Sequence, residues 1–157
     1  GGGFAYVDDK GVIIRIPHIL SKDTYVKTGM SLKEKKNLVT HCRIATCGER
    51  SILNAHPFIN EKRTVAMAHN GQFQAGGEER KSDTNVFFEM TNGMLEREDL
   101  LDTETVTALG ALIGHYNKLI LLFKSGNYKI INEKEGFWSK DKTKWYSNRY
   151  WTKGTIP

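Results

Sequence analysis

The order of its segments constrains the fold of this chain more than any other feature. Strand-like segments stand at both ends, and two helix-like segments stand in the middle. Helical spacing of apolar residues marks residues 84–95 and 104–115. Runs rich in β-branched, aromatic or aliphatic residues occupy 4–7, 12–16, 37–45, 63–68, 119–123, 128–131 and 144–148. Strands followed by helices and then by strands favour an α+β fold with antiparallel sheets over a parallel, doubly wound sheet.

Turn and cap residues set the ends of these segments. Asp8-Asp9-Lys10-Gly11 separates the first two strands and Ser125-Gly126-Asn127 separates a later pair, so each pair is predicted to form a hairpin. His69-Asn70-Gly71 is predicted to turn after the strand at 63–68. Residues 21–30 are predicted to be helical or loop-like. Candidate helix caps are Ser21, Ser82, Asp83, Asp102 and Thr103.

The composition narrows the class of protein. The 157 residues suit a single domain spanning 1–157, and 39% of them are hydrophobic, as in a globular chain. No apolar run approaches the roughly 20 residues that cross a bilayer, and the first residues lack the features of a signal peptide. The chain has no initiator Met, so we expect its start to be processed, trimmed or incompletely recorded. The formal charge of +5 permits an acidic partner without requiring one.

The two cysteines, Cys42 and Cys47, do not form a metal or disulfide pattern. Their spacing is not that of a zinc site, and two thiols are too few for a disulfide framework. No pair of histidines has zinc-ligand spacing either. We therefore expect no metal, no cofactor, and a reducing, cytoplasmic setting.

Three polar clusters lie where a predicted strand ends or a helix begins. Arg43 carries a planar guanidinium suited to a carboxylate. Asn70 and Gly71 offer a side-chain amide and a main-chain N–H, two donors that can converge on an oxyanion. Asp83 can hold an ammonium group. Together they would bind an α-amino acid, although each also has a structural interpretation, as a surface ion pair, a turn and a helix cap respectively.

The order of these clusters carries a family resemblance. The motifs, in chain order, are Arg43-Ile44-Ala45-Thr46-x-Gly48, His56-Pro57-Phe58, Ala68-His69-Asn70-Gly71 and Ser82-Asp83-Thr84. This series resembles the class II glutamine amidotransferase family of the N-terminal nucleophile (Ntn) hydrolase superfamily, its small phage-encoded and bacterial members above all. The opening Gly1-Gly2-Gly3-Phe4-Ala5-Tyr6 and the closing Lys144-Trp145-Tyr146-Ser147-Asn148 are similar to strands of that family, so the resemblance spans nearly the whole chain.

The resemblance implies a four-layer αββα sandwich of two mainly antiparallel sheets. It implies that Arg43, with Thr46, binds the carboxylate of glutamine and that Asp83 binds its amino group. Asn70 and Gly71 would form the oxyanion hole. Enzymes of this family attack the glutamine side-chain amide with an N-terminal cysteine whose α-amine, titrating near pH 8, serves as the base. The ammonia released would pass to a separate acceptor or synthetase protein.

The nucleophile is the main departure from the family pattern. The family's cysteine lies on a strand that precedes the segment opening this chain, so the first strand and the nucleophile are expected to lie outside the given sequence. Two explanations stay open. The native polypeptide is longer and begins with the cysteine, or the protein is a catalytically inactive descendant that binds protein or nucleic acid. Cys47 is disfavoured as a substitute because it lies on the wrong strand for the attack.

A segment at 138–153 mixes aromatic and basic residues. Its members are Trp138, Lys140, Lys142, Lys144, Trp145, Tyr146, Arg149, Tyr150, Trp151 and Lys153. Aromatic rings among cations can stack bases and contact phosphates. One mildly basic segment outside a recognisable nucleic-acid fold favours instead a last strand pair and a tail that cover the edge of the sandwich.

Overall fold

The computed structural model describes residues 2–18, 21–42, 51–73 and 80–149, and within these ranges it is a mixed α+β protein. The described strands are β1 (Gly2–Val7), β2 (Ile13–His18), β3 (Val39–Cys42), β4 (Phe58–Ile59), β5 (Val65–Asn70), β6 (Lys118–Phe123), β7 (Tyr128–Ile131), β8 (Phe137–Trp138) and β9 (Trp145–Tyr146). The described α-helices are α1 (Lys22–Ser31), α2 (Asp83–Leu95) and α3 (Thr103–Ile113).

Every strand pairing is antiparallel, as the order of segments predicted. The first sheet has the order β2-β1-β3, the second has the order β4-β5-β6-β7, and β8 and β9 form a separate pair. The hairpins β1–β2 and β6–β7 are those expected from the two turn sequences, and both are confirmed. Sequence reasoning missed the short strands β4 and β8, because a paired segment of two residues has no detectable alternation.

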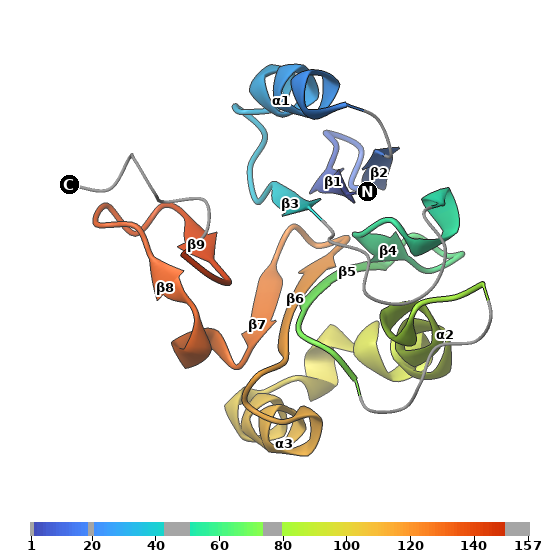
Figure 1. Cartoon of the computed structure of the whole chain (residues 1–157). Helices are drawn as coiled ribbons and strands as arrows, with labels where there is room; N and C mark the ends of the chain where they lie inside the picture. Colours follow the sequence, from blue (N-terminus) through green and yellow to red (C-terminus); the bar gives the residue numbers. More distant parts are fainter. Residues whose placement is uncertain (1, 19–20, 43–50, 74–79, 150–157) are drawn as a thin grey trace.

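The sheets and helices stack in layers, with α1 outside the first sheet and with α2 and α3 outside the second (Figure 1). Residues of the two facing sheet surfaces form one core cluster, which contains Ala5, Ile13, Val39, Ala66, Ala68 and Leu122. Residues between the second sheet and the two helices form another, which includes Val65, Met67, Phe88, Leu109 and Leu121. On the far side of the first sheet, the rings of Phe4 and Tyr25 stack at 4.5 Å between centroids.

Strand alternation along β5 determines which way its polar end residues face. Val65 and Met67 belong to the cluster under the helices, whereas Ala66 and Ala68 belong to the cluster between the sheets. Because side chains alternate along a strand, His69 continues the row that faces the helices and Asn70 the row that faces the first sheet. A predicted turn at His69-Asn70-Gly71 is therefore corrected: His69 and Asn70 are still in the strand, paired with Leu119 and Lys118.

The helix ends follow local hydrogen bonding. The hydroxyl of Ser82 accepts from the N–H of Asn85 at 3.2 Å, so Ser82 is the N-cap of α2 and Asp83 is its first helical residue. The carboxylate of Asp102 caps α3 through the N–H of Thr105 at 2.8 Å. The helix predicted to reach residue 115 ends at Ile113, because Gly114 takes a φ of 82°, which lies outside helical geometry.

In the ranges the structure describes, no helix combines the length and the apolar character that a membrane crossing needs.

Candidate functional site

The sequence-predicted site residues fall into two groups. Asn70 is the last residue of β5, Gly71 follows it, and Asp83 opens α2. Arg43 and Thr46, the residues expected to bind a carboxylate, lie outside the described residues, as does Cys47. The described part of the site is therefore built around the end of β5 and the start of α2.

Two unused hydrogen-bond donors stand side by side at the end of β5. Among the described residues, nothing accepts a hydrogen bond from the main-chain N–H of Gly71 or from the side-chain amide of Asn70. Gly71 is exposed and Asn70 is half-buried, so both donors can reach a ligand. Donors that are adjacent and not engaged by protein acceptors are what an oxyanion site requires.

The backbone at Gly71 accepts no other residue. Its φ of 147° lies in a region that L-residues rarely adopt. A Cβ atom at this position would also overlap Oδ1 of Asn117 and Nε2 of His69. Both restrictions explain why this position holds glycine.

A hydrogen bond brings the carboxylate of Asp83 beside this turn. Oδ2 of Asp83 accepts from the N–H of Phe73 at 2.7 Å, two residues beyond Gly71. Oδ1 is 3.4 Å from the hydroxyl of Thr84. Asp83 is 8% exposed, and its place in the first turn of α2 stabilises its negative charge through the helix dipole. The structure thus gathers Asn70, Gly71 and Asp83 at one end of the second sheet.

The start of α2 is anchored by Asn54, a residue that sequence reasoning missed. Its Oδ1 accepts from the N–H of Ser82 at 2.8 Å, and its Nδ2 donates to the carbonyl of Arg80 at 2.8 Å. Asn54 is 1% exposed, and it lies next to Asn85, whose Nδ2 donates to the carbonyl of Leu53 at 2.9 Å. Nothing in the sequence around Asn54 signals this burial, because its partners lie about thirty positions away along the chain.

Asn117 holds the other side of the turn. Its Nδ2 donates to the carbonyl of Ile113 at 2.6 Å, so its Oδ1 faces the turn and accepts from the N–H of Gln72 at 2.8 Å. The same Oδ1 lies 2.9 Å from Nε2 of His69. An amide oxygen only accepts, so Nε2 of His69 carries a proton.

The contact with Asn117 and the burial of the ring together determine the protonation of the His69 imidazole. Nδ1 of His69 lies 2.7 Å from the hydroxyl of Thr84. Burial lowers the pKa of His69 below its ordinary value of 6.5. The ring is therefore neutral at pH 7, and the Thr84 hydroxyl donates to Nδ1. His69 also stacks on Phe73 at 4.1 Å between centroids, which packs the turn against the helix side of the sheet.

Two further histidines bond the main chain of His69. β4 pairs only with Ala66 and Met67, so it does not reach the level of His69. There the N–H of His69 donates to Nδ1 of His56 at 3.4 Å, and Nε2 of His41 donates to the carbonyl of His69 at 2.9 Å. His41, His56 and His69 thus act as structural hydrogen-bonding residues at the end of β5. The described residues contain no cluster of three or more His, Cys, Asp or Glu placed to hold a metal ion.

Comparison with known proteins gives one partial similarity. Over 85 residues, the chain is 33% identical to the glutamine–fructose-6-phosphate aminotransferase (isomerizing) of Clostridium perfringens (strain 13 / Type A). The aligned stretch is 54% of this chain but 12% of that protein, so the chain spans only a small part of its relative. No protein-family model matches the chain. The similarity is distant and covers only this part of the chain.

Proposed function

We propose that this chain is a class II glutamine amidotransferase domain of the Ntn-hydrolase type that binds L-glutamine at the end of β5. The observation that carries the proposal is the pair of unengaged donors, Asn70 Nδ2 and Gly71 N–H, beside the carboxylate of Asp83. The partial similarity to an aminotransferase named for glutamine supports it. The order of layers, from α1 through two antiparallel sheets to α2 and α3, agrees with the αββα sandwich of that superfamily.

Each residue has a role in the proposed complex. Asp83 binds the α-ammonium group of glutamine, and Arg43 with Thr46 binds its carboxylate. Held at both ends, the ligand presents its side-chain carbonyl to Asn70 and Gly71. Precise placement of this kind makes the attack effectively intramolecular.

The proposed reaction is hydrolysis of the glutamine side-chain amide. A cysteine thiolate adds to the carbonyl carbon, and the oxygen of the tetrahedral intermediate receives hydrogen bonds from Asn70 and Gly71. The α-amine that took the thiol proton gives it to the leaving nitrogen, so that collapse of the intermediate breaks the C–N bond and releases ammonia. Water then adds to the thioester, and breaking of the C–S bond gives glutamate and the free thiol. The nucleophile is the N-terminal cysteine of a segment outside the given sequence. A separate cytoplasmic acceptor or synthetase protein would consume the ammonia.

The first test is glutamine binding by the chain itself, measured by isothermal titration calorimetry. We expect L-glutamine to bind and D-glutamine to bind at least tenfold more weakly, because a mirror-image ligand cannot satisfy both charged ends and the carbonyl together. Asp83→Asn should weaken binding at least tenfold. Asn127→Ala is the matched control, since Asn127 bonds Glu98 on the surface at a distance from the turn. No heat with L-glutamine from a folded sample would overturn the proposal.

The second test separates an active enzyme from an inactive descendant. A polypeptide that carries the upstream cysteine segment should release ammonia from glutamine. Asn70→Ala should lower its kcat by roughly 10²–10³-fold, the usual effect of removing one oxyanion donor. Glutamine binding without ammonia release from that longer polypeptide would favour the inactive binding module instead.

A further inference from the structure

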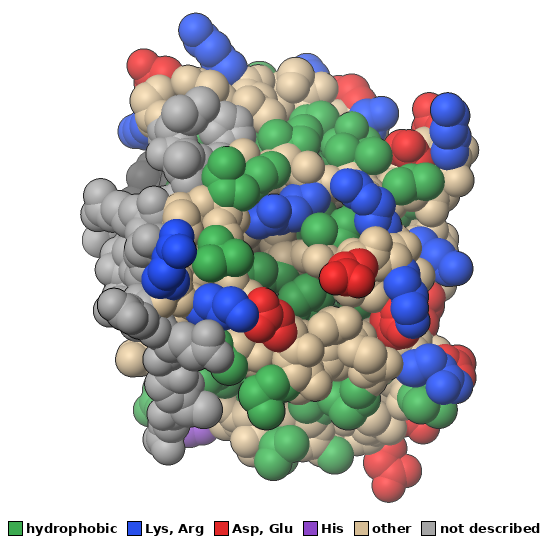
Figure 2. Space-filling view, turned by 90° about the vertical axis from the view of Figure 1, so that its right-hand side faces the viewer, with side chains coloured by type: hydrophobic (Ala, Val, Ile, Leu, Met, Phe, Trp, Pro, Cys, Tyr) green, Lys and Arg blue, Asp and Glu red, His purple; other side chains and the backbone are tan. Residues whose placement is uncertain are grey.

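A hollow on another face of the molecule is not used by the proposed reaction. It lies between α2 and β4, has a volume of about 680 Å³, and does not include Asn70, Gly71 or Asp83 in its walls. Figure 2 shows this face, with hydrophobic side chains at the floor of the hollow and charged side chains around its rim. Pockets that bind small molecules commonly span about 300–1,000 Å³, so the hollow has the size of such a site.

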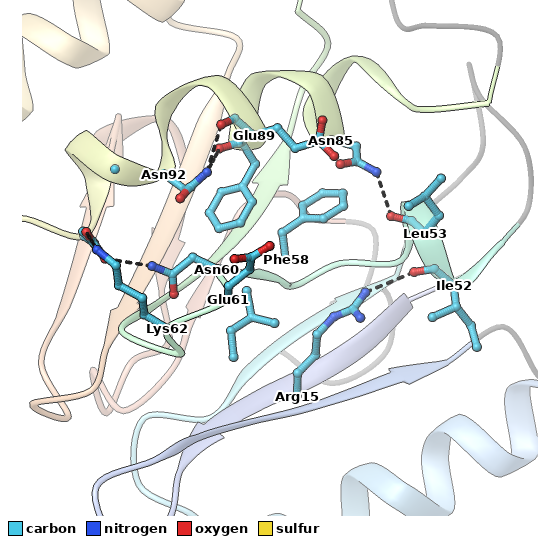
Figure 3. A pocket seen from close by; sticks show the side chains of 14 residues that line it. Arg15, Ile52, Leu53, Phe58, Asn60, Glu61, Lys62, Asn85, Glu89 and Asn92 are labelled. Atoms are coloured by element: carbon cyan, nitrogen blue, oxygen red, sulfur yellow. Dashed lines mark hydrogen bonds and ion pairs between the residues drawn. The ribbon is translucent and has the colours of Figure 1, made fainter.

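The floor of the hollow is aromatic and firmly packed. Phe58 of β4 and Phe88 of α2 stack with their ring centroids 5.8 Å apart, and they are 5% and 4% exposed. Figure 3 shows the ring of Phe58 inside the hollow. Gly93 of α2 leaves open space beside them, because a Cβ built on it meets no atom within 4 Å. The hollow is therefore preformed, and at Gly93 it is kept open by a missing side chain.

The cationic side chains in the wall of the hollow, Arg15 and Lys62, are bonded to protein acceptors. The guanidinium of Arg15 donates to the carbonyls of Ile52, Ala55 and Pro57, at distances of 2.6 to 3.1 Å. Lys62 pairs with Glu96 at 2.8 Å. Figure 3 shows the guanidinium of Arg15 turned toward the carbonyl of Ile52. Both cations are therefore engaged by protein acceptors, and the hollow does not favour an anionic ligand.

Several hydrogen-bond acceptors in the wall of the hollow are not engaged by donors of the described residues. Within the described ranges, Glu61 has no hydrogen-bond or ion-pair partner, and Oε1 of Glu89 has none because Lys81 bonds Oε2. Nδ2 of Asn85, a residue 4% exposed, donates to the carbonyl of Leu53 and lies 3.4 Å from Oδ1 of Asn54, and Nδ2 of Asn92 donates to the carbonyls of Phe88 and Glu89. In the part of the chain that the structure describes, no donor bonds Oδ1 of Asn85 or of Asn92. The hollow thus presents two carboxylates and two amide oxygens above aromatic rings.

We propose that this hollow is a binding site for a small organic cation, a guanidinium or primary ammonium on an apolar stem. The cationic head would donate to Glu61, Glu89 and the amide oxygens, and the stem would lie over Phe58 and Phe88. An ionised donor matched to carboxylates gives the strong class of hydrogen bond, and a cation near an aromatic ring is attracted by the face of that ring. The site is separate from the proposed glutamine site and does not depend on it.

The test uses two probes of nearly equal shape. Nα-acetyl-L-argininamide carries a guanidinium and no free amine, and Nα-acetyl-L-citrullinamide carries a neutral urea in place of the guanidinium; they are called argininamide and citrullinamide below. We expect argininamide to bind, with at least a tenfold preference over citrullinamide, when followed by calorimetry and by amide chemical shifts of α2 and β4. Equal affinity for the two compounds, or no binding of argininamide at millimolar concentration, would overturn the proposal.

Substitutions in the wall of the hollow test whether the cation binds there. Gly93 lies in the wall of the hollow, and a Cβ built on it meets no atom within 4 Å. Leucine also has a higher helix propensity than glycine, so Gly93→Leu should fold, and its side chain should block the hollow and abolish binding. Glu61→Gln should weaken binding about tenfold, whereas Glu34→Gln, an exposed carboxylate beside Lys33, should not change it. Full binding by Gly93→Leu would refute the location. Tighter binding of the capped peptide acetyl-Gly-Arg-Gly-amide than of argininamide would refute a small-molecule ligand.

Discussion

Replacing Asn117 with alanine tests how the turn after β5 is held. Three hydrogen bonds of its side chain join this turn, the ring of His69 and the end of α3. In Asn117→Ala, Nε2–H of His69 loses its acceptor although His69 is only 3% exposed. A buried donor left without a partner costs about 1–3 kcal/mol.

The other two losses are smaller, because water can reach the groups that are freed. The N–H of Gln72 lies in an exposed residue, and the carbonyl of Ile113 lies at the end of a helix. Each net hydrogen bond contributes about 0.5–1.5 kcal/mol. The three losses together range from about 2 to 6 kcal/mol. Because water replaces two of the three bonds, we expect Asn117→Ala to lower the free energy of unfolding by the lower part of that range, about 2–4 kcal/mol.

The assay is urea denaturation at pH 7, followed by circular dichroism and tryptophan fluorescence. Asn127→Ala is the matched control: it removes an exposed hydrogen bond to Glu98 and should change the free energy of unfolding by no more than about 0.5 kcal/mol. Asn117→Asp keeps an acceptor in place of Oδ1, so we expect it to lose less stability than the alanine variant. Its added negative charge should raise the pKa of His69.

Glutamine binding gives the second readout for Asn117. If the turn sets the direction of the Gly71 N–H, Asn117→Ala should weaken glutamine binding even under conditions where the variant is fully folded. A loss of stability below about 1 kcal/mol, equal to that of the control, would refute the assigned role of the three hydrogen bonds. Unchanged glutamine affinity in a destabilised variant would refute the positioning of the turn.

Three other variants or titrations test the same region. Gly71→Ala should lower the free energy of unfolding by more than about 2 kcal/mol, because its φ and its contact with Asn117 both exclude a Cβ; a Tm equal to that of the parent chain would contradict this. In an NMR titration, the ring of His69 should gain its proton with a midpoint below 6.5, so that the stability it contributes is complete above pH 6.5 and declines as the pH falls toward the lowered pKa; a midpoint at or above 6.5 would contradict the neutral buried ring. Ser82→Ala removes the cap of α2 and should cost about 1 kcal/mol in urea denaturation, an effect that Ser82→Asp should largely avoid.

Much of the local structure could be predicted from the sequence. Hairpins at β1–β2 and β6–β7 follow from turn residues between alternating segments, and Asp102 and Ser82 cap helices as their side chains suggest. These features depend on residues only a few positions apart. The hydrogen bonds that form these turns and caps join residues within one turn of the chain, so the local sequence is enough to predict them.

The candidate site could be predicted only in part. Asn70, Gly71 and Asp83 were predicted as site residues from their chemistry and their resemblance to a family motif, and the structure brings the three to one end of the second sheet. Asn54 and Asn117 escaped prediction. Each is an ordinary asparagine in its own segment, and each acts through partners 26 to 48 positions away along the chain.

The sequence by itself determined the antiparallel α+β class and the types of residue that we propose bind an amino acid. Only the tertiary structure decided that Asn70 faces the first sheet while His69 faces the helices, and that no acceptor among the described residues engages the donors at residues 70 and 71. The physical reason is that the sheet and the helices packed against the two faces of β5 determine what each of its alternating side chains contacts. Whether a donor is free depends on which distant acceptors packing brings within reach.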